Sequence, residues 1–145
     1  CPDYLPTNWQ CVQNNLVGPN ADLNGANLRY ADLTYAYLYD ANLRYADLYD
    51  ADLSYANLTQ ADIRYADLTG ADLSNADLSR ANLQSTDLTS ADLSNANLTD
   101  TYLIFTDLTS ADLTGANLNG VYWVDTTCPD GTMNYDNGNT CENNL

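Results

Sequence analysis

The sequence repeats every five residues from Ala21 to Gly120 without interruption. Across the twenty pentads, the third place is Leu in nineteen and Ile63 in the other, the first place is Ala in seventeen, and the second is Asp or Asn in eighteen. A period of five matches neither an α-helix, with about 3.6 residues per turn, nor a flat strand, with about two. A Leu every five residues would also wind around a helix and leave no apolar stripe. The period therefore predicts a solenoid, in which each unit buries its apolar side against copies of itself.

Each pentad is expected to form one side of a coil. The Leu at the third place and the Ala at the first point inward, so that large and small side chains alternate between layers, and the other three places point outward. This A(D/N)LXX pattern resembles the pentapeptide-repeat family over residues 21–125. The resemblance implies an all-β fold, a right-handed quadrilateral β-helix with four pentads per turn, and the twenty pentads then give about five turns. Residues twenty apart become vertical neighbours at a spacing of ~4.8 Å, in a rod of roughly 25 Å.

Both ends of the chain depart from the period. Residues 1–20 are predicted to form an N-terminal cap, in which residues 14–18 are interpreted as an imperfect pentad with Leu16 at the Leu place. The β-helix is predicted over residues 21–125, and its last pentad has Trp123 at the Leu place. Residues 126–145, rich in Gly, Asn and Asp, are predicted to form a C-terminal cap or tail.

All four cysteines lie in these caps. A rod of the kind that the resemblance implies separates its ends, so the expected disulfides are Cys1–Cys11 and Cys128–Cys141. Four free thiols are the alternative, and zinc is disfavoured because the chain has no His and no CxxC spacing. Disulfides indicate an oxidising compartment. We therefore expect an exported protein of the periplasm or the thylakoid or plastid lumen, after removal of a signal peptide, with lipid attachment at Cys1 as a less favoured reading.

The formal net charge of −16 comes from twenty acidic residues against four arginines. Such a charge disfavours binding to nucleic acid or to anionic membranes and favours a soluble monomer. No segment is apolar over a length that could span a membrane. The twenty-residue register predicts an acidic ladder, a column of five carboxylates on one face: Asp32, Asp52, Asp72, Asp92 and Asp112. Because hard cations need six or more converging oxygens, we expect neither a metal site nor a cofactor.

The aromatic and basic residues gather in the N-terminal half of the repeat region. Tyr and Arg are favoured at protein interfaces, although Tyr also suits β-structure for packing reasons alone. The candidate interaction face comprises Tyr30, Tyr35, Tyr45, Tyr65, Arg29, Arg44 and Arg64. Near the other end, Ile104, Phe105 and Val124 occupy outward places. We expect the tail, including Met133 and Tyr135, to fold over this apolar patch.

Catalysis is not expected, because the chain has no His or Lys for the usual nucleophile–base pairs and its Asp residues lie on convex, wet faces. The sequence favours a non-enzymatic, exported structural or protein-interaction module that binds an unidentified protein. The resemblance implies this role weakly, since many family members are exported in cyanobacteria or reside in the plastid lumen. It also implies an alternative, an acidic DNA mimic acting on DNA gyrase or topoisomerase. The cysteine-closed tail, the shorter rod and the expected disulfides all depart from that class.

Overall fold

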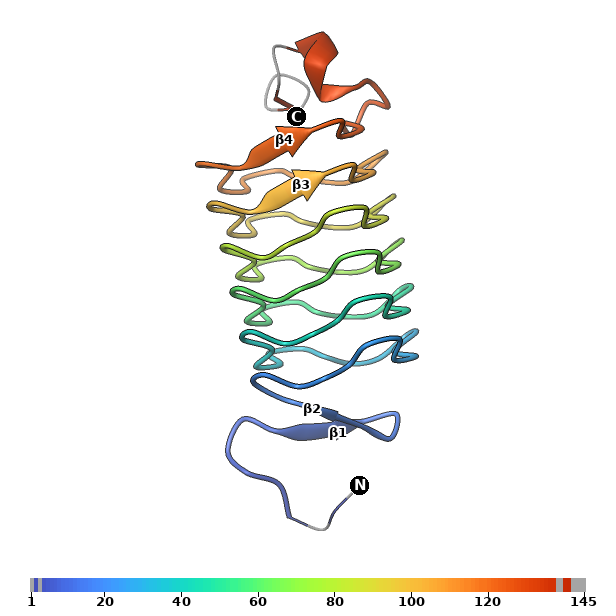
Figure 1. Ribbon diagram of the computed structural model, residues 1–145, viewed down its shortest axis with the longest axis vertical. Coiled ribbons are helices and arrows are strands. Elements are labelled where there is room, and N and C mark those ends of the chain that lie inside the picture. Colours follow the sequence, from blue (N-terminus) through green and yellow to red (C-terminus); the bar gives the residue numbers. More distant parts are fainter. Residues whose placement is uncertain (1, 3, 138–139, 142–145) are drawn as a thin grey trace.

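The computed structural model describes residues 2, 4–137, 140 and 141, which form an elongated coil of stacked turns (Figure 1). The regular elements are β1 (Gln10–Val12), β2 (Asn15–Val17), β3 (Tyr102–Ile104), β4 (Tyr122–Val124) and the 3₁₀ helix η1 (Asn134–Asn137). Strands β1 and β2 pair antiparallel, whereas β3 and β4 pair in parallel on adjacent turns. The fold is an all-β solenoid.

Backbone hydrogen bonds join residues that are twenty apart in the sequence. Parallel bridges run from Asp22↔Asn42 to Asp107↔Thr127. A typical rung has the Asp62 N–H donating to the Ala41 carbonyl at 2.9 Å, while the Leu43 N–H donates to the Asp62 carbonyl at 2.8 Å. Because every one of these parallel bridges spans twenty residues, one turn contains four pentads.

The interior is built from the first and third places of the pentads. Every Leu at the third place from residue 23 to residue 118 is buried, and Ile63 takes the same position. Most first-place Ala residues are also buried, although Ala26 and Ala116 are only partly so. Outward and inward places therefore follow the predicted alternation.

The corners of the coil lie at the fifth place. Its residue adopts a left-handed conformation, as in Tyr45 (φ 57°) and Arg80 (φ 60°), and the N–H of the next pentad donates back across the turn. The Ala46 N–H donates to the Leu43 carbonyl at 3.1 Å, for example. A positive φ at the third residue of a four-residue turn is the mark of a type II turn, which favours Gly and Asn. The many non-glycine residues at this place, including Tyr, are held there by the rungs above and below.

Threonine replaces Ala at the first place in Thr86, Thr101 and Thr106, and all three are buried. Each hydroxyl donates to a carbonyl on the turn below: Ile63 for Thr86 and Leu78 for Thr101, both at 2.9 Å, and Leu83 for Thr106 at 2.8 Å. A buried hydroxyl without a partner would be costly. These Thr residues therefore fit the core because the coil supplies an acceptor, which the sequence pattern did not indicate.

Strands β1 and β2 form a hairpin near the N-terminal end of the coil, and the interpretation of residues 14–18 as a pentad is wrong. Leu16 pairs with Cys11 in the β1–β2 ladder and is 43% exposed, while its neighbour Val17 is fully buried. The Trp9 side chain packs against the core cluster and lies so close to Gly18 that a methyl group there would overlap the indole. Val12 of β1 also packs against this cluster, so the hairpin contributes to the apolar interior.

The bridge ladder continues into the C-terminal segment. Thr126 and Cys128 are buried, and Cys128 takes the place of the Leu in its pentad. Cys128 forms a disulfide with Cys141. The buried Asn134 accepts a hydrogen bond from the Thr126 N–H at 2.9 Å. In Figure 1 the segment with η1 lies beyond the last turn, at the end of the coil.

The other expected disulfide involves a residue that the structure does not describe. Cys11 is disulfide-bonded, and its expected partner Cys1 lies outside the described residues.

We predict that Leu68→Ala lowers the free energy of unfolding by about 2–5 kcal/mol, because the Leu68 side chain is 1% exposed and its removal leaves a cavity. Urea unfolding monitored by circular dichroism measures the change. The matched control is Thr69→Ala at the neighbouring outward place, for which we expect a much smaller effect. Equal effects from the two substitutions would contradict the inward position of Leu68.

Candidate interaction face

The second-place Asp and Asn side chains serve the turns that follow them. In pentad after pentad, the side-chain oxygen accepts a hydrogen bond from the backbone N–H two residues later. Examples are Asp72 with Ser74 at 2.8 Å and Asn57 with Thr59 at 3.0 Å. This is an Asx turn, which Asp and Asn form equally well. The structure thus explains why the second place alternates freely between the two residues.

The acidic ladder lies on one side of the coil, where parallel bridges connect all five Asp residues in sequence from Asp32 to Asp112. Their carboxylates are turned toward their own chain. The Ser54 hydroxyl and N–H donate to Asp52 and lower the pKa of its carboxyl, and Thr114 does the same for Asp112. Within the described residues, no group of three or more His, Cys, Asp or Glu side chains is arranged to hold a metal ion. The ladder is therefore accounted for by turn formation.

The predicted Tyr/Arg face is divided among three corners of the coil. Tyr45 and Tyr65 share one corner and stack with ring centroids 5.0 Å apart and planes 9° apart. Tyr35 stacks instead on Tyr55 at another corner, and Tyr30 meets the ring of Tyr49 edge-on at 5.7 Å. The seven residues therefore do not form a single surface. Those that the structure brings together are Arg44, Tyr45, Arg64 and Tyr65.

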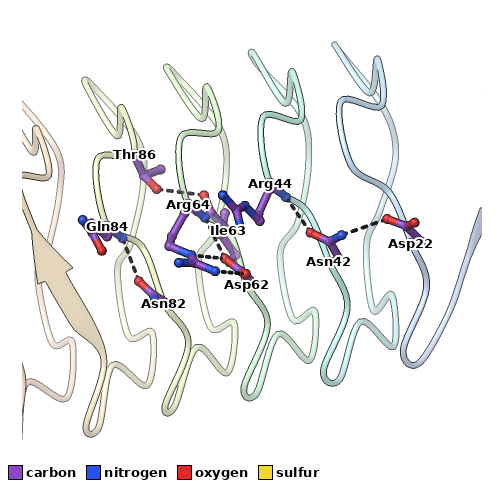
Figure 2. Close-up of polar contacts among 9 residues, drawn as sticks. All are labelled: Asp22, Asn42, Arg44, Asp62, Ile63, Arg64, Asn82, Gln84 and Thr86. Atoms are coloured by element: carbon purple, nitrogen blue, oxygen red, sulfur yellow. Dashed lines mark hydrogen bonds and ion pairs between the residues drawn. The ribbon is translucent and has the colours of Figure 1, made fainter.

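We call the side of the coil that bears these four residues the β3–β4 face, because its later pentads contain strands β3 and β4. It comprises the pentads that begin at residues 21, 41, 61, 81, 101 and 121. Figure 2 shows its polar residues from Asp22 to Gln84. The Asn42 amide reaches down to Asp22 at 2.9 Å, so neighbouring turns are also linked through side chains.

The arginines of the β3–β4 face differ in their partners. Arg64 binds Asp62 through two hydrogen bonds, Nε to Oδ1 at 2.7 Å and Nη2 to Oδ2 at 2.6 Å, and these bonds lower the pKa of the Asp62 carboxyl. Arg44 forms no ion pair with any described residue, and its buried Nε has no hydrogen-bond partner there. Its guanidinium carbon lies 5.6 Å from the ring centroid of Tyr45 and 5.8 Å from that of Tyr65. Arg44 thus places a positive charge beside the two stacked rings, and this charge also helps to lower the pKa of the Asp62 carboxyl.

Arg29 lies on the neighbouring side of the coil. It pairs with Asp47 at 3.1 Å and lies 4.2 Å from the ring centroid of Tyr49. Hydrogen bonding to Tyr30, and then to Asp47, raises the pKa of its guanidinium. Its charge is therefore satisfied within the coil.

The last two pentads of the β3–β4 face carry apolar and aromatic side chains at their outward places. Tyr102 and Tyr122 stack with ring centroids 4.7 Å apart and planes 7° apart, and Ile104 pairs with Val124 in the next column. The expectation that the tail covers this patch is wrong. Phe105 is 56% exposed and Val124 46% exposed, because η1 lies beyond the end of the coil.

A groove that the sequence reasoning missed borders this apolar part. It encloses about 400 Å³ and is lined by Gln60, Arg80, Asp100, Tyr102 and Tyr122. Tyr102 and Tyr122 stand at second places, where a Tyr side chain cannot form the Asx turn. The signal in the sequence was this departure from Asp or Asn, which exchanges a turn-stabilising contact for an exposed ring.

Comparison with known proteins identifies the family. A family described as pentapeptide repeats matches residues 21–60, 41–80, 56–95 and 81–120, which together cover more than half of the chain. The chain belongs to the pentapeptide-repeat family. No match was found among curated protein sequences.

Solved structures of other pentapeptide-repeat proteins resemble this one. HetL from the cyanobacterium Nostoc sp. strain PCC 7120 is 38% identical, with a TM-score of 0.62, over 79% of this chain and 56% of HetL. Rfr23 from the cyanobacterium Cyanothece 51142 is 30% identical, with a TM-score of 0.60, over 69% of this chain and 85% of Rfr23. QnrB1, a plasmid-mediated fluoroquinolone resistance protein, shares the fold at 20% identity and a TM-score of 0.57, over 74% of this chain and 58% of QnrB1. This pentapeptide-repeat chain thus spans little more than half the length of HetL.

In the part of the chain that the structure describes, no helix has both the length and the apolar character needed to cross a bilayer.

We predict that Asp72→Ala lowers the free energy of unfolding by about 1 kcal/mol, because the Ser74 N–H loses its acceptor. The matched variant Asp72→Asn keeps an acceptor oxygen and removes one charge from the ladder, so we expect it to be neutral or slightly stabilising. Urea unfolding of both variants measures the difference. If both substitutions destabilised the protein equally, charge rather than turn formation would be the role of Asp72.

The ion pair between Asp62 and Arg64 should make the stability of the protein depend on pH. Since the folded-state pKa of Asp62 is lowered by Arg64, its stabilising contribution is fully present above the unfolded-state pKa of about 4 and is lost as the pH falls through the folded-state value. We expect the stability difference between the wild-type protein and Asp62→Asn to be largest above about pH 5 and to shrink as the pH falls below about 4. Urea unfolding across this range measures it. In an Arg64→Gln background most of the pH dependence should disappear; its persistence would assign it to another partner.

Proposed function

We propose that this pentapeptide-repeat protein is a non-enzymatic binding rod whose β3–β4 face docks a protein partner. The observation that carries the proposal is the exposure of Tyr102, Phe105, Tyr122 and Val124 together on two adjacent turns of a chain with net charge −16. Contiguous exposed apolar side chains on a polar surface are typical of interaction sites. The fold does not need them, because the interior is already filled by Leu and Ala.

The rigidity of the scaffold supports this role. The exposed side chains project from β3 and β4, which are held in register by Tyr102↔Tyr122, Leu103↔Trp123 and Ile104↔Val124. A surface fixed by backbone hydrogen bonds loses little conformational freedom on binding. At the other end of the same face, Arg44 offers a cation next to the stacked rings of Tyr45 and Tyr65, and Arg and Tyr are enriched at interface hot spots.

A non-enzymatic role agrees with the state of the carboxylates. The pKa values of Asp52, Asp62 and Asp112 are shifted downward by hydrogen bonds, whereas a general acid needs a raised pKa. HetL, described as involved in the regulation of heterocyst differentiation, is a relative whose role is regulatory, which supports a binding function here.

We place this function in an oxidising compartment outside the cytosol. The support is the buried disulfide between Cys128 and Cys141, together with the disulfide-bonded state of Cys11. The same disulfides weigh against the alternative of a DNA mimic acting on gyrase, which would work in a reducing cytosol. The likeness to QnrB1 concerns the fold.

A site-specific photocrosslinker tests the proposal. A benzoylphenylalanine residue replaces Phe105 in one variant and Tyr55, an exposed fifth-place residue of another column, in the control. Irradiation in the source cells should yield discrete protein adducts from position 105 and few from position 55. Adducts that are equal at both positions, or absent at 105 while the protein is folded and abundant, would contradict a docking role for the β3–β4 face.

A further inference from the structure

The β3–β4 face also indicates what kind of partner it takes, an inference that rests on the proposed function. We propose that the face docks an amphipathic α-helix of the partner, aligned with the long axis of the rod, whose apolar stripe is flanked by basic residues.

The backbone of the face is closed to an added strand. Its hydrogen bonds run along the rod, from Ser85 N–H to the Ile104 carbonyl and from Phe105 N–H to the Val124 carbonyl, both at 2.8 Å. The Tyr122 N–H likewise donates to the Thr101 carbonyl at 2.9 Å. Strand addition requires unpaired donors and acceptors at a sheet edge. On this side of the coil a partner meets side chains, so it must satisfy its own backbone, as a helix does.

The side chains form two parallel columns that suit a helix. Tyr102 and Tyr122 form the second-place column, and Ile104 and Val124 form the fourth-place column. The columns are two residues apart along each strand, which separates them by about 7 Å. Successive turns of the rod are ~4.8 Å apart, close to the ~5.4 Å pitch of an α-helix. Apolar residues at i, i+3, i+4 and i+7 of an aligned helix therefore lie over successive turns of this part of the face.

The charges around the apolar patch favour a partner helix with basic residues on both sides of its apolar stripe. Asp100 lines the groove beside Tyr102 and Tyr122, at one corner of the face. At the other corner Asp125 follows Val124, and Asp107 lies two residues after Phe105. Arg80 lines the same groove one turn below Asp100, and from Ala81 onward the sequence contains no further Lys or Arg. A helix with Lys or Arg on both sides of its stripe would meet carboxylates at both corners, whereas acidic flanks would be repelled.

A second copy of the chain is a poorer occupant. Pairing two such faces would bring together surfaces that carry the same carboxylates, on molecules with net charge −16 each. The repulsion between like charges opposes this arrangement. A basic helix from another protein gains attraction from the same carboxylates.

The test uses two synthetic peptides of about 18 residues that share one Leu stripe and differ only in flanks of Lys or Glu. Binding to the isotopically labelled full chain is followed by NMR shift mapping and titration at physiological ionic strength. We expect the Lys peptide to bind and to shift signals of β3, β4 and Phe105, and the Glu peptide to bind at least about tenfold more weakly.

Variants separate this site from general attraction to an acidic rod. Phe105→Ser introduces a residue that already adopts the same left-handed conformation in Ser85, one turn below at the same corner, and Val124→Thr keeps the branched shape. Each should weaken the Lys peptide about tenfold. The matched control Tyr55→Ser removes an equally exposed ring from another column and should leave the affinity unchanged, with all three variants folded by circular dichroism.

Four outcomes overturn the inference. The Lys peptide fails to bind; it binds with unchanged affinity to the Phe105 and Val124 variants; its shifts map to the acidic ladder; or the Glu peptide binds as tightly. Concentration-dependent shifts of β3 and β4 without peptide would instead assign the face to self-association and also reject the helix. None of these results touches the crosslinking test of the proposed function, so a failed partner chemistry and a failed docking role remain distinguishable.

Discussion

The twenty-residue register of backbone hydrogen bonds is the constraint on which the remaining structure depends. Each rung bonds to the rung below and to the rung above. Asp62 bonds through its N–H to Ala41 and through its carbonyl to Leu43 on one side, while on the other side the Ala61 carbonyl and the Ile63 N–H bond to Asn82. This ladder sets which residues become neighbours, and therefore which side chains form columns. It also holds the corner residues in left-handed conformations that, for non-glycine residues, cost on the order of 1–2 kcal/mol each. Asx turns and stacked rings partly offset this cost.

The interior could be predicted from the periodicity, and the columns from the four pentads per turn that the family resemblance implies. A strict pentad leaves Leu and Ala as the only residues able to fill an interior, and adding twenty to a residue number identifies its neighbour. The stacking of Tyr45 on Tyr65 follows from that arithmetic. The same arithmetic separates Tyr30 and Tyr35 from them, so grouping these residues by their nearness in sequence overstated the extent of the face. Residues that are close together in the sequence lie on different, adjacent sides of the rod.

The parts that could not be predicted are those without a repeat to extrapolate. Whether Leu16 or Val17 points inward depends on the antiparallel pairing of β1 with β2, which departs from the pentad frame. The position of η1 depends on Cys128, which occupies a core position and draws the segment to the end of the coil through Cys141. The groove beside Tyr102 lies across a corner and combines residues from four turns, so it cannot be predicted from the sequence of any single pentad. The hydroxyl contact of Thr86 likewise depends on a carbonyl twenty-three residues away.

Because the pentads are equivalent, such a rod can gain or lose repeats during evolution. Duplicating or deleting twenty residues lengthens or shortens the coil by one turn and leaves every column in place. A change of five residues also keeps the interior intact, because Leu and Ala remain in frame. It nevertheless moves all later pentads to the next side of the rod, so that β3 and β4 would no longer share a side with Arg44 and Arg64. Such an insertion would leave folding intact but would divide a binding surface that spans several turns. If this surface is under selection, related proteins should lack insertions or deletions of five residues between residues 65 and 101.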